Sequence, residues 1–100
     1  PAPQPEPAPA IPAERFQEAL DKAQSLRDRG LYPVAARLYA EAAQSAPTGD
    51  ARRHARFEEI ACYVKTGQND KARALAAELR ASNVLTRVER IKLDAIERMG

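Results

Sequence analysis

Eight prolines divide this chain of 100 residues into a leader and a body. Six of them lie within residues 1–12, where they alternate with Ala, Gln and Glu. Proline fixes φ and has no amide hydrogen, so a stretch of this kind favours an extended polyproline conformation over a helix or a strand. We therefore expect residues 1–12 to be a flexible Pro/Ala-rich linker and residues 13–100 to form the folded domain.

In the body, apolar residues recur every three or four positions, which is the period of a helix packed on one face. Five helices and no strands are expected. The first runs from Pro12 to about Arg29, the second starts near Pro33 and is stopped by Pro47, and the third is capped by Asp50 and ends at Gly67. The fourth is capped by Asn69, and the fifth begins after the capping box Thr86-Arg87-Val88-Glu89 and continues to Gly100.

Apolar residues on one face of each helix are the candidate core. They are Phe16, Leu20, Ala23, Leu26; Val34, Ala35, Leu38, Tyr39, Ala42; Phe57, Ile60, Ala61, Val64; Ala72, Leu75, Ala76, Leu79; and Val88, Ile91, Ala95, Ile96, Met99. The loops between the expected helices are only a few residues long. Short loops join helices that are neighbours in space, so we expect successive antiparallel hairpins.

Three glycines mark a repeat. Gly30, Gly67 and Gly100 lie 37 and 33 residues apart and each ends an expected helix, which brackets the period of about 34 residues of tetratricopeptide repeats. The second-helix signature of that family falls on Gly30, Leu31, Tyr32, Ala35, Tyr39, Ala42 and Pro47, and its small first-helix residue on Ala23. The chain therefore resembles a tetratricopeptide repeat protein.

The second unit matches the family less fully. Tyr63, Gly67 and Ala72 fit, but Asn69 and Ala76 stand where aromatic residues are usual and Val84 where proline is usual. The resemblance implies an all-α fold in which five helices form antiparallel hairpins, stacked as a short right-handed superhelix of about two and a half repeats.

The resemblance also implies a binding face. In this family the first helix of each pair lines the concave side, which places there Gln17, Gln24, Arg27, Asp28, His54, Phe57, Ala61 and Lys65. Chaperone-binding members hold a peptide's terminal carboxylate with paired Lys and Asn. Leu20 and Gln24 occupy the corresponding positions here, so such a clamp is not expected.

The last helix has an unusually broad apolar arc. Val84, Leu85, Val88, Ile91, Ala95, Ile96 and Met99 span about 140°, and Leu93 lies further round. A terminal helix of an array is expected to have a polar outer face. Either another helix follows, or residues such as Ile91 and Ile96 contact a partner or a second copy of the chain.

The ionisable residues argue against catalysis and against nucleic acid. Sixteen Lys and Arg are interspersed with 14 Asp and Glu, so no basic block is present. His54 and Cys62 are eight residues apart on one helix, or about 12 Å along its axis, too far for a nucleophile and base. One cysteine excludes an internal disulfide and a cysteine zinc cluster. We expect no cofactor, metal or enzymatic activity.

These observations favour a noncatalytic scaffold or adaptor that binds a peptide or a protein surface. The alternative is a helical accessory, regulatory or oligomerisation module of a larger bacterial envelope or secretion protein, self-associating through its last helix. No apolar run is long enough for direct membrane insertion. A proline-rich spacer before a helical module favours the periplasm or cell envelope over the cytoplasm.

Overall fold

The computed structural model describes residues 12–82 and 85–98, and every regular element in these ranges is a helix. The five helices are α1 (Pro12–Asp28), α2 (Tyr32–Gln44), α3 (Gly49–Lys65), α4 (Asn69–Ser82) and α5 (Arg87–Glu97). The all-helical prediction is confirmed. Pro12 opens α1 and is not part of the linker; the rest of the expected linker, with Val84, Met99 and Gly100, lies outside the described residues.

Two glycines end helices in the same way. Gly30 and Gly67 have φ of 81° and 74°, in the left-handed region that glycine adopts at little cost. After α1, the amide of Gly30 donates to Arg27 and that of Leu31 to Leu26; after α3, the amide of Gly67 donates to Val64 and that of Gln68 to Tyr63. This pair of bonds is a Schellman motif, which satisfies carbonyls that the helix end leaves without partners.

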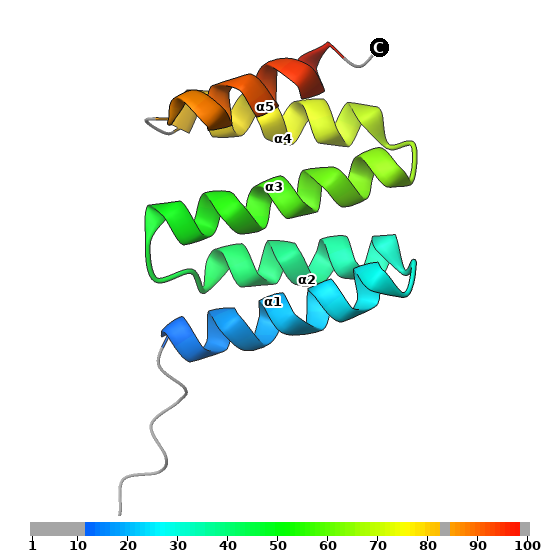
Figure 1. Ribbon diagram of the computed structural model, residues 1–100, viewed down its shortest axis with the longest axis vertical. Helices are drawn as coiled ribbons and strands as arrows, with labels where there is room; N and C mark the ends of the chain where they lie inside the picture. Colours follow the sequence, from blue (N-terminus) through cyan, green and yellow to red (C-terminus); the bar gives the residue numbers. More distant parts are fainter. Residues whose placement is uncertain (1–11, 83–84, 99–100) are drawn as a thin grey trace, which may run out of the picture.

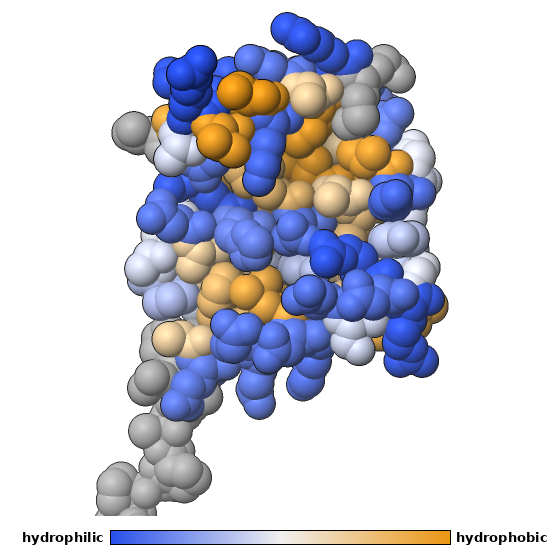
Figure 2. All heavy atoms as spheres, in the orientation of Figure 1, coloured by the Kyte–Doolittle hydropathy of each residue, from blue (hydrophilic) through white to orange (hydrophobic). Residues whose placement is uncertain are grey.

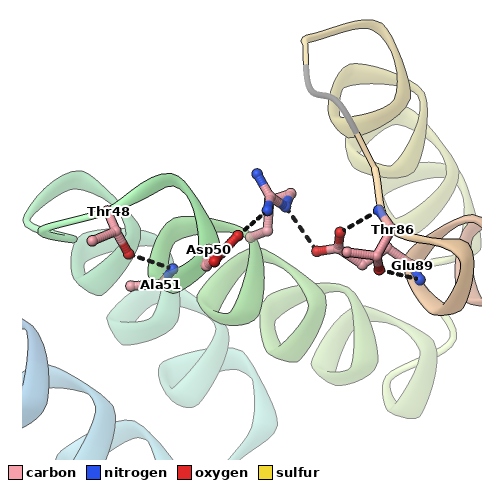
Figure 3. Close-up of polar contacts among 6 residues, drawn as sticks. Thr48, Asp50, Ala51, Thr86 and Glu89 are labelled. Carbon is pink, nitrogen blue, oxygen red and sulfur yellow. Dashed lines mark hydrogen bonds and ion pairs between the residues drawn. The ribbon is translucent and has the colours of Figure 1, made fainter.

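Of the five predicted helix starts three are confirmed, and one of these is the start of α1 at Pro12. The capping box of α5 is confirmed, with the Thr86 amide donating to Glu89 Oε1 at 2.9 Å and the Glu89 amide donating to Thr86 Oγ1 at 3.2 Å (Figure 3). Proline near the start of α2 is also confirmed. The cap of α3 is Thr48, whose Oγ1 accepts from Ala51, so the prediction of Asp50 was wrong. Asn69 is the first helical residue of α4, not the residue before it.

The helices stack in chain order, each antiparallel to the next, and each packs mainly against its sequence neighbours (Figure 1). Two of the three buried clusters lie among α1, α2 and α3, near opposite ends of these helices, and the third lies among α3, α4 and α5. They are Phe16, Ala42, Ala43, Ala55; then Ala23, Ala35, Ala36, Tyr39, Cys62; then Ile60, Ala72, Leu75, Ala76, Leu79, Leu93. Because most of the first two clusters is alanine, α1, α2 and α3 can approach closely.

The core of α5 differs from the prediction. Leu93 is fully buried, whereas Val88 and Ile91 are 61% and 59% exposed and Ala95 is also exposed. The reason is the rotation of the helix about its axis: Glu89, Leu93 and Ile96, spaced i, i+4, i+7, face inward. Two predicted core residues elsewhere, Val34 of α2 and Ala61 of α3, are exposed as well.

Ion pairs flank the buried Leu93 in this rotation of α5. Arg53 Nε of α3 donates to Glu89 Oε2 at 2.7 Å, and Arg53 also pairs with Asp50 (Figure 3). On the other side of Leu93, Arg80 of α4 binds both Asp94 and Glu97. One arginine of α3 and one of α4 therefore form ion pairs with carboxylates of α5, and Leu93 lies between these contacts.

Candidate protein-binding face

Helices α1, α3 and α5 lie nearer the viewer than α2 and α4 in Figure 1 and form one face of the stack. Two hollows lie on this face. The polar hollow, between α1 and α3, has a volume of about 400 Å³ and is lined by Gln17, Leu20, Gln24, Arg27, Tyr39, His54 and Glu58. The apolar groove, between α3 and α5, has a volume of about 440 Å³ and is lined by Phe57, Glu58, Ile60, Ala61, Val64, Lys65, Lys92, Ala95 and Ile96.

An ion pair crosses the polar hollow. Arg27 of α1 binds Glu58 of α3, and the Arg27 guanidinium lies 6.0 Å from the centre of the Tyr39 ring. Burial raises the pKa of Tyr39 although Arg27 acts to lower it. The amides of Gln17 and Gln24, with the imidazole of His54, supply hydrogen-bonding groups around this pair.

Apolar side chains form the walls of the apolar groove, and Lys65 and Lys92 form its basic rim. Phe57 and Val64 are half-buried against the core cluster of α4 and α5, and the exposed Ala61 lies between them along α3. Lys92 Nζ lies 5.4 Å from the centre of the Phe57 ring, which is within range of a cation–π contact. Figure 2 shows hydrophobic side chains gathered over α3 and α5, with a smaller apolar area nearer α1.

Glu58 lines both hollows, so they adjoin along α3. The face therefore offers a segment of another protein hydrogen-bonding groups at one end and apolar contacts at the other. Aligned grooves of this kind suit an elongated ligand better than a small compact one.

Six of the eight predicted partner-binding residues line one hollow or the other. Gln24, Arg27 and His54 lie at the polar hollow, and Phe57, Lys65 and Ile96 at the apolar groove. The other two do not: Asp28 is exposed at the end of α1, and Ile91 is exposed on α5 without lining either hollow. Gln17 and Ala61, which the resemblance also placed on the face, line the polar hollow and the apolar groove respectively.

The sequence analysis gave no role to two lining residues, Glu58 and Lys92, and assigned five others to the core: Leu20, Tyr39, Ile60, Val64 and Ala95. Glu58 could have been found, since it follows Phe57 and lies four residues after His54, on the same side of α3. Lys92 and Ala95 depend on the rotation of α5, which its apolar pattern did not specify.

Two buried ionisable residues, Cys62 and Glu59, lie outside both hollows. Cys62 is buried, and burial raises the pKa of its thiol, which keeps it protonated and poorly nucleophilic. Glu59 is buried too, but it binds Arg56 and accepts a hydrogen bond from the Tyr63 hydroxyl at 2.7 Å. Within residues 12–82 and 85–98, no three His, Cys, Asp or Glu side chains are grouped so as to hold a metal ion.

None of the described helices is both long enough and apolar enough to cross a bilayer. Comparisons of the chain with protein-family models, with curated proteins and with solved structures found no match.

Proposed function

We propose that this chain is a noncatalytic scaffold of the tetratricopeptide-like kind, which binds a segment of another protein on the face formed by α1, α3 and α5. The observation that carries the proposal is the pair of adjoining hollows on that face, both of which use α3. The Schellman motifs that end α1 and α3, with their glycines 37 residues apart, support the assignment of a helical-hairpin repeat.

A peptide selection tests this function. Random peptides about 16 residues long, displayed on phage, are selected against the immobilised full chain, and the enriched peptides are measured by fluorescence anisotropy. Binding is expected to weaken about tenfold when Ala61 is changed to Gln, because the longer side chain fills the apolar groove.

A matched variant controls for damage to the fold. Ala77→Gln makes the same change at an exposed position of α4, outside both hollows, and is expected to bind like the parent. Both alanines are exposed on helices and glutamine is a good helix former, so both variants should fold. Absence of selectable peptides, or equal weakening by both variants, would contradict the proposed function.

The alternative function, an oligomerisation module, rests on the exposure of Val88 and Ile91 on α5. Sedimentation over a concentration series, for the parent and for a Val88→Ser, Ile91→Ser double variant, decides between the two. Self-association of the parent that the double variant abolishes would favour this alternative. Ile96 is unsuitable for the test because it packs against the core cluster.

A further inference from the structure

We propose that the apolar groove between α3 and α5 binds an acidic amphipathic helix of a partner protein, with its apolar side chains in the groove and its carboxylates against Lys65 and Lys92. This inference rests on the proposed function and specifies the chemical class of the partner. It is carried by the shape of the groove, by the charge on its rim and by the apolar surface that continues from it over α5.

The groove has the dimensions of a helix-binding site. Along α3, Phe57, Ala61 and Val64 recur at i, i+4 and i+7, which spans about 10 Å of helix. Ala95 and Ile96 form the facing wall on α5. A partner helix presents apolar side chains with the same spacing, so that it can fill the groove over two turns.

The lysines at the rim of the groove give it a positive charge that no ion pair of the described residues neutralises. Within the described residues every cation paired with a carboxylate is an arginine, namely Arg27, Arg53, Arg56, Arg73 and Arg80. Lys65 and Lys92 are exposed and have no carboxylate within ion-pairing distance in that part of the chain. Glu58, the acidic group at the groove, is already neutralised by Arg27. The ligand that complements this rim therefore has acidic side chains.

Apolar surface extends the groove along α5. Val88, Ile91 and Ala95 share one side of the helix by their spacing, and Ala95 lines the groove. The exposure of Val88 and Ile91 follows from the rotation that buries Leu93. A helix of several turns that starts in the groove would cover these two side chains as well.

The exposed apolar surface that a second copy carries outside α5 does not supply this ligand. Besides Val88 and Ile91, its large exposed apolar residues are Leu31 and Val34, near the turn between α1 and α2. Arg29 and Arg37 flank them in the sequence, so this surface has the same sign of charge as the groove rim. Repulsion between like charges disfavours the pairing.

The peptides selected on the full chain provide the probe. Sequencing is expected to show enrichment of Asp and Glu around apolar residues spaced i, i+3, i+4 and i+7. For the strongest binder, changing Lys65 or Lys92 to Gln is expected to weaken binding roughly two- to fivefold each, and raising the NaCl concentration to weaken it further. Lys22→Gln, an exposed change on α1 away from the groove, is the matched control and should have no effect.

The outcomes separate this inference from the function on which it rests. Peptides without acidic enrichment that still lose binding with Ala61→Gln would overturn the acidic-helix proposal and leave the scaffold function standing. Acidic peptides that are insensitive to Lys65→Gln and Lys92→Gln, or that also lose binding with Lys22→Gln, would overturn it too. If no peptide binds the chain, both proposals fail.

Discussion

At the scale of single residues, Tyr63 joins two parts of the core. Its ring packs against the cluster around Tyr39 and against the cluster around Leu93, and Lys71 Nζ lies 5.8 Å from the ring centre. Its hydroxyl donates to Glu59, which Arg56 also binds. Burial first, and the hydrogen bond to Glu59 second, raise the pKa of Tyr63 to about 12.

This pKa predicts an alkaline loss of stability. Above a pH of about 10 the unfolded chain releases the tyrosine proton, while the folded chain keeps it until about pH 12, so the free energy of unfolding falls with rising pH in this window. Tyr63→Phe removes this contribution and is expected to cost about 1 kcal/mol at neutral pH, through the lost hydrogen bond. Urea unfolding of both proteins from pH 8 to 12 measures this. Equal slopes against pH would contradict the assignment.

At the scale of elements, α5 is held by few contacts. Leu93 is its one fully buried residue within the described range, and Ile96 is half-buried. The capping box of Thr86 and Glu89 starts the helix, and the same Glu89 carboxylate binds Arg53 of α3. Burial alone would raise the pKa of Glu89, but hydrogen bonds from the Thr86 amide and from Arg53 outweigh it and lower the pKa. One carboxylate therefore both starts α5 and fastens it to α3.

Two alanine substitutions test the rotation of α5. Leu93→Ala leaves a cavity against α4 and is expected to cost about 2–5 kcal/mol of unfolding free energy. Ile91→Ala removes an exposed side chain and should cost less than about 1 kcal/mol. Chemical denaturation of the two variants gives both values. Equal costs would mean that Ile91 faces the core.

At the scale of the molecule, the described helices form a linear array in which each helix depends on its neighbours. In such an array stability differs from one end to the other, because inner helices are packed on both sides and outer ones on one. Helix α3 packs against both α2 and α4, whereas α5 packs mainly against α4. The second wall of the apolar groove therefore belongs to one of the less firmly packed elements.

Hydrogen exchange of the native chain measures this gradient. Amides of α5 are expected to exchange faster than those in the middle of α3, because α5 can separate from α4 without unfolding the array. Leu93→Ala should speed exchange in α5 much more than in α1 or α2, from which it is distant in the stack. A single exchange free energy shared by the buried amides of all the helices would show instead that the domain unfolds only as a whole.

Local chemistry in the sequence determined the helical elements. Proline near helix starts, the Thr86 and Glu89 capping box, and glycines where the backbone becomes left-handed act within a few residues, so they can be recognised before any fold is known. The same locality explains the small errors: Thr48 and Asp50 are both good capping residues two positions apart, and the sequence does not favour one strongly. Of the residues that the resemblance assigned to one face, Gln24, Arg27 and His54 line the same hollow.

Only the tertiary structure decided which side of α5 faces the core. The apolar arc of that helix is broad enough for several rotations, and the inward side includes Glu89, a charged residue that hydrophobicity would place outside. In the observed rotation the contacts are with partners distant in the sequence: Leu93 packs against the cluster of α3 and α4, Arg53 binds Glu89, and Arg80 binds Asp94 and Glu97. The same rotation places Lys92 and Ala95 at the groove and exposes Val88 and Ile91. The candidate binding surface therefore depends on contacts between helices. These contacts cannot be predicted from the apolar periodicity of a single helix.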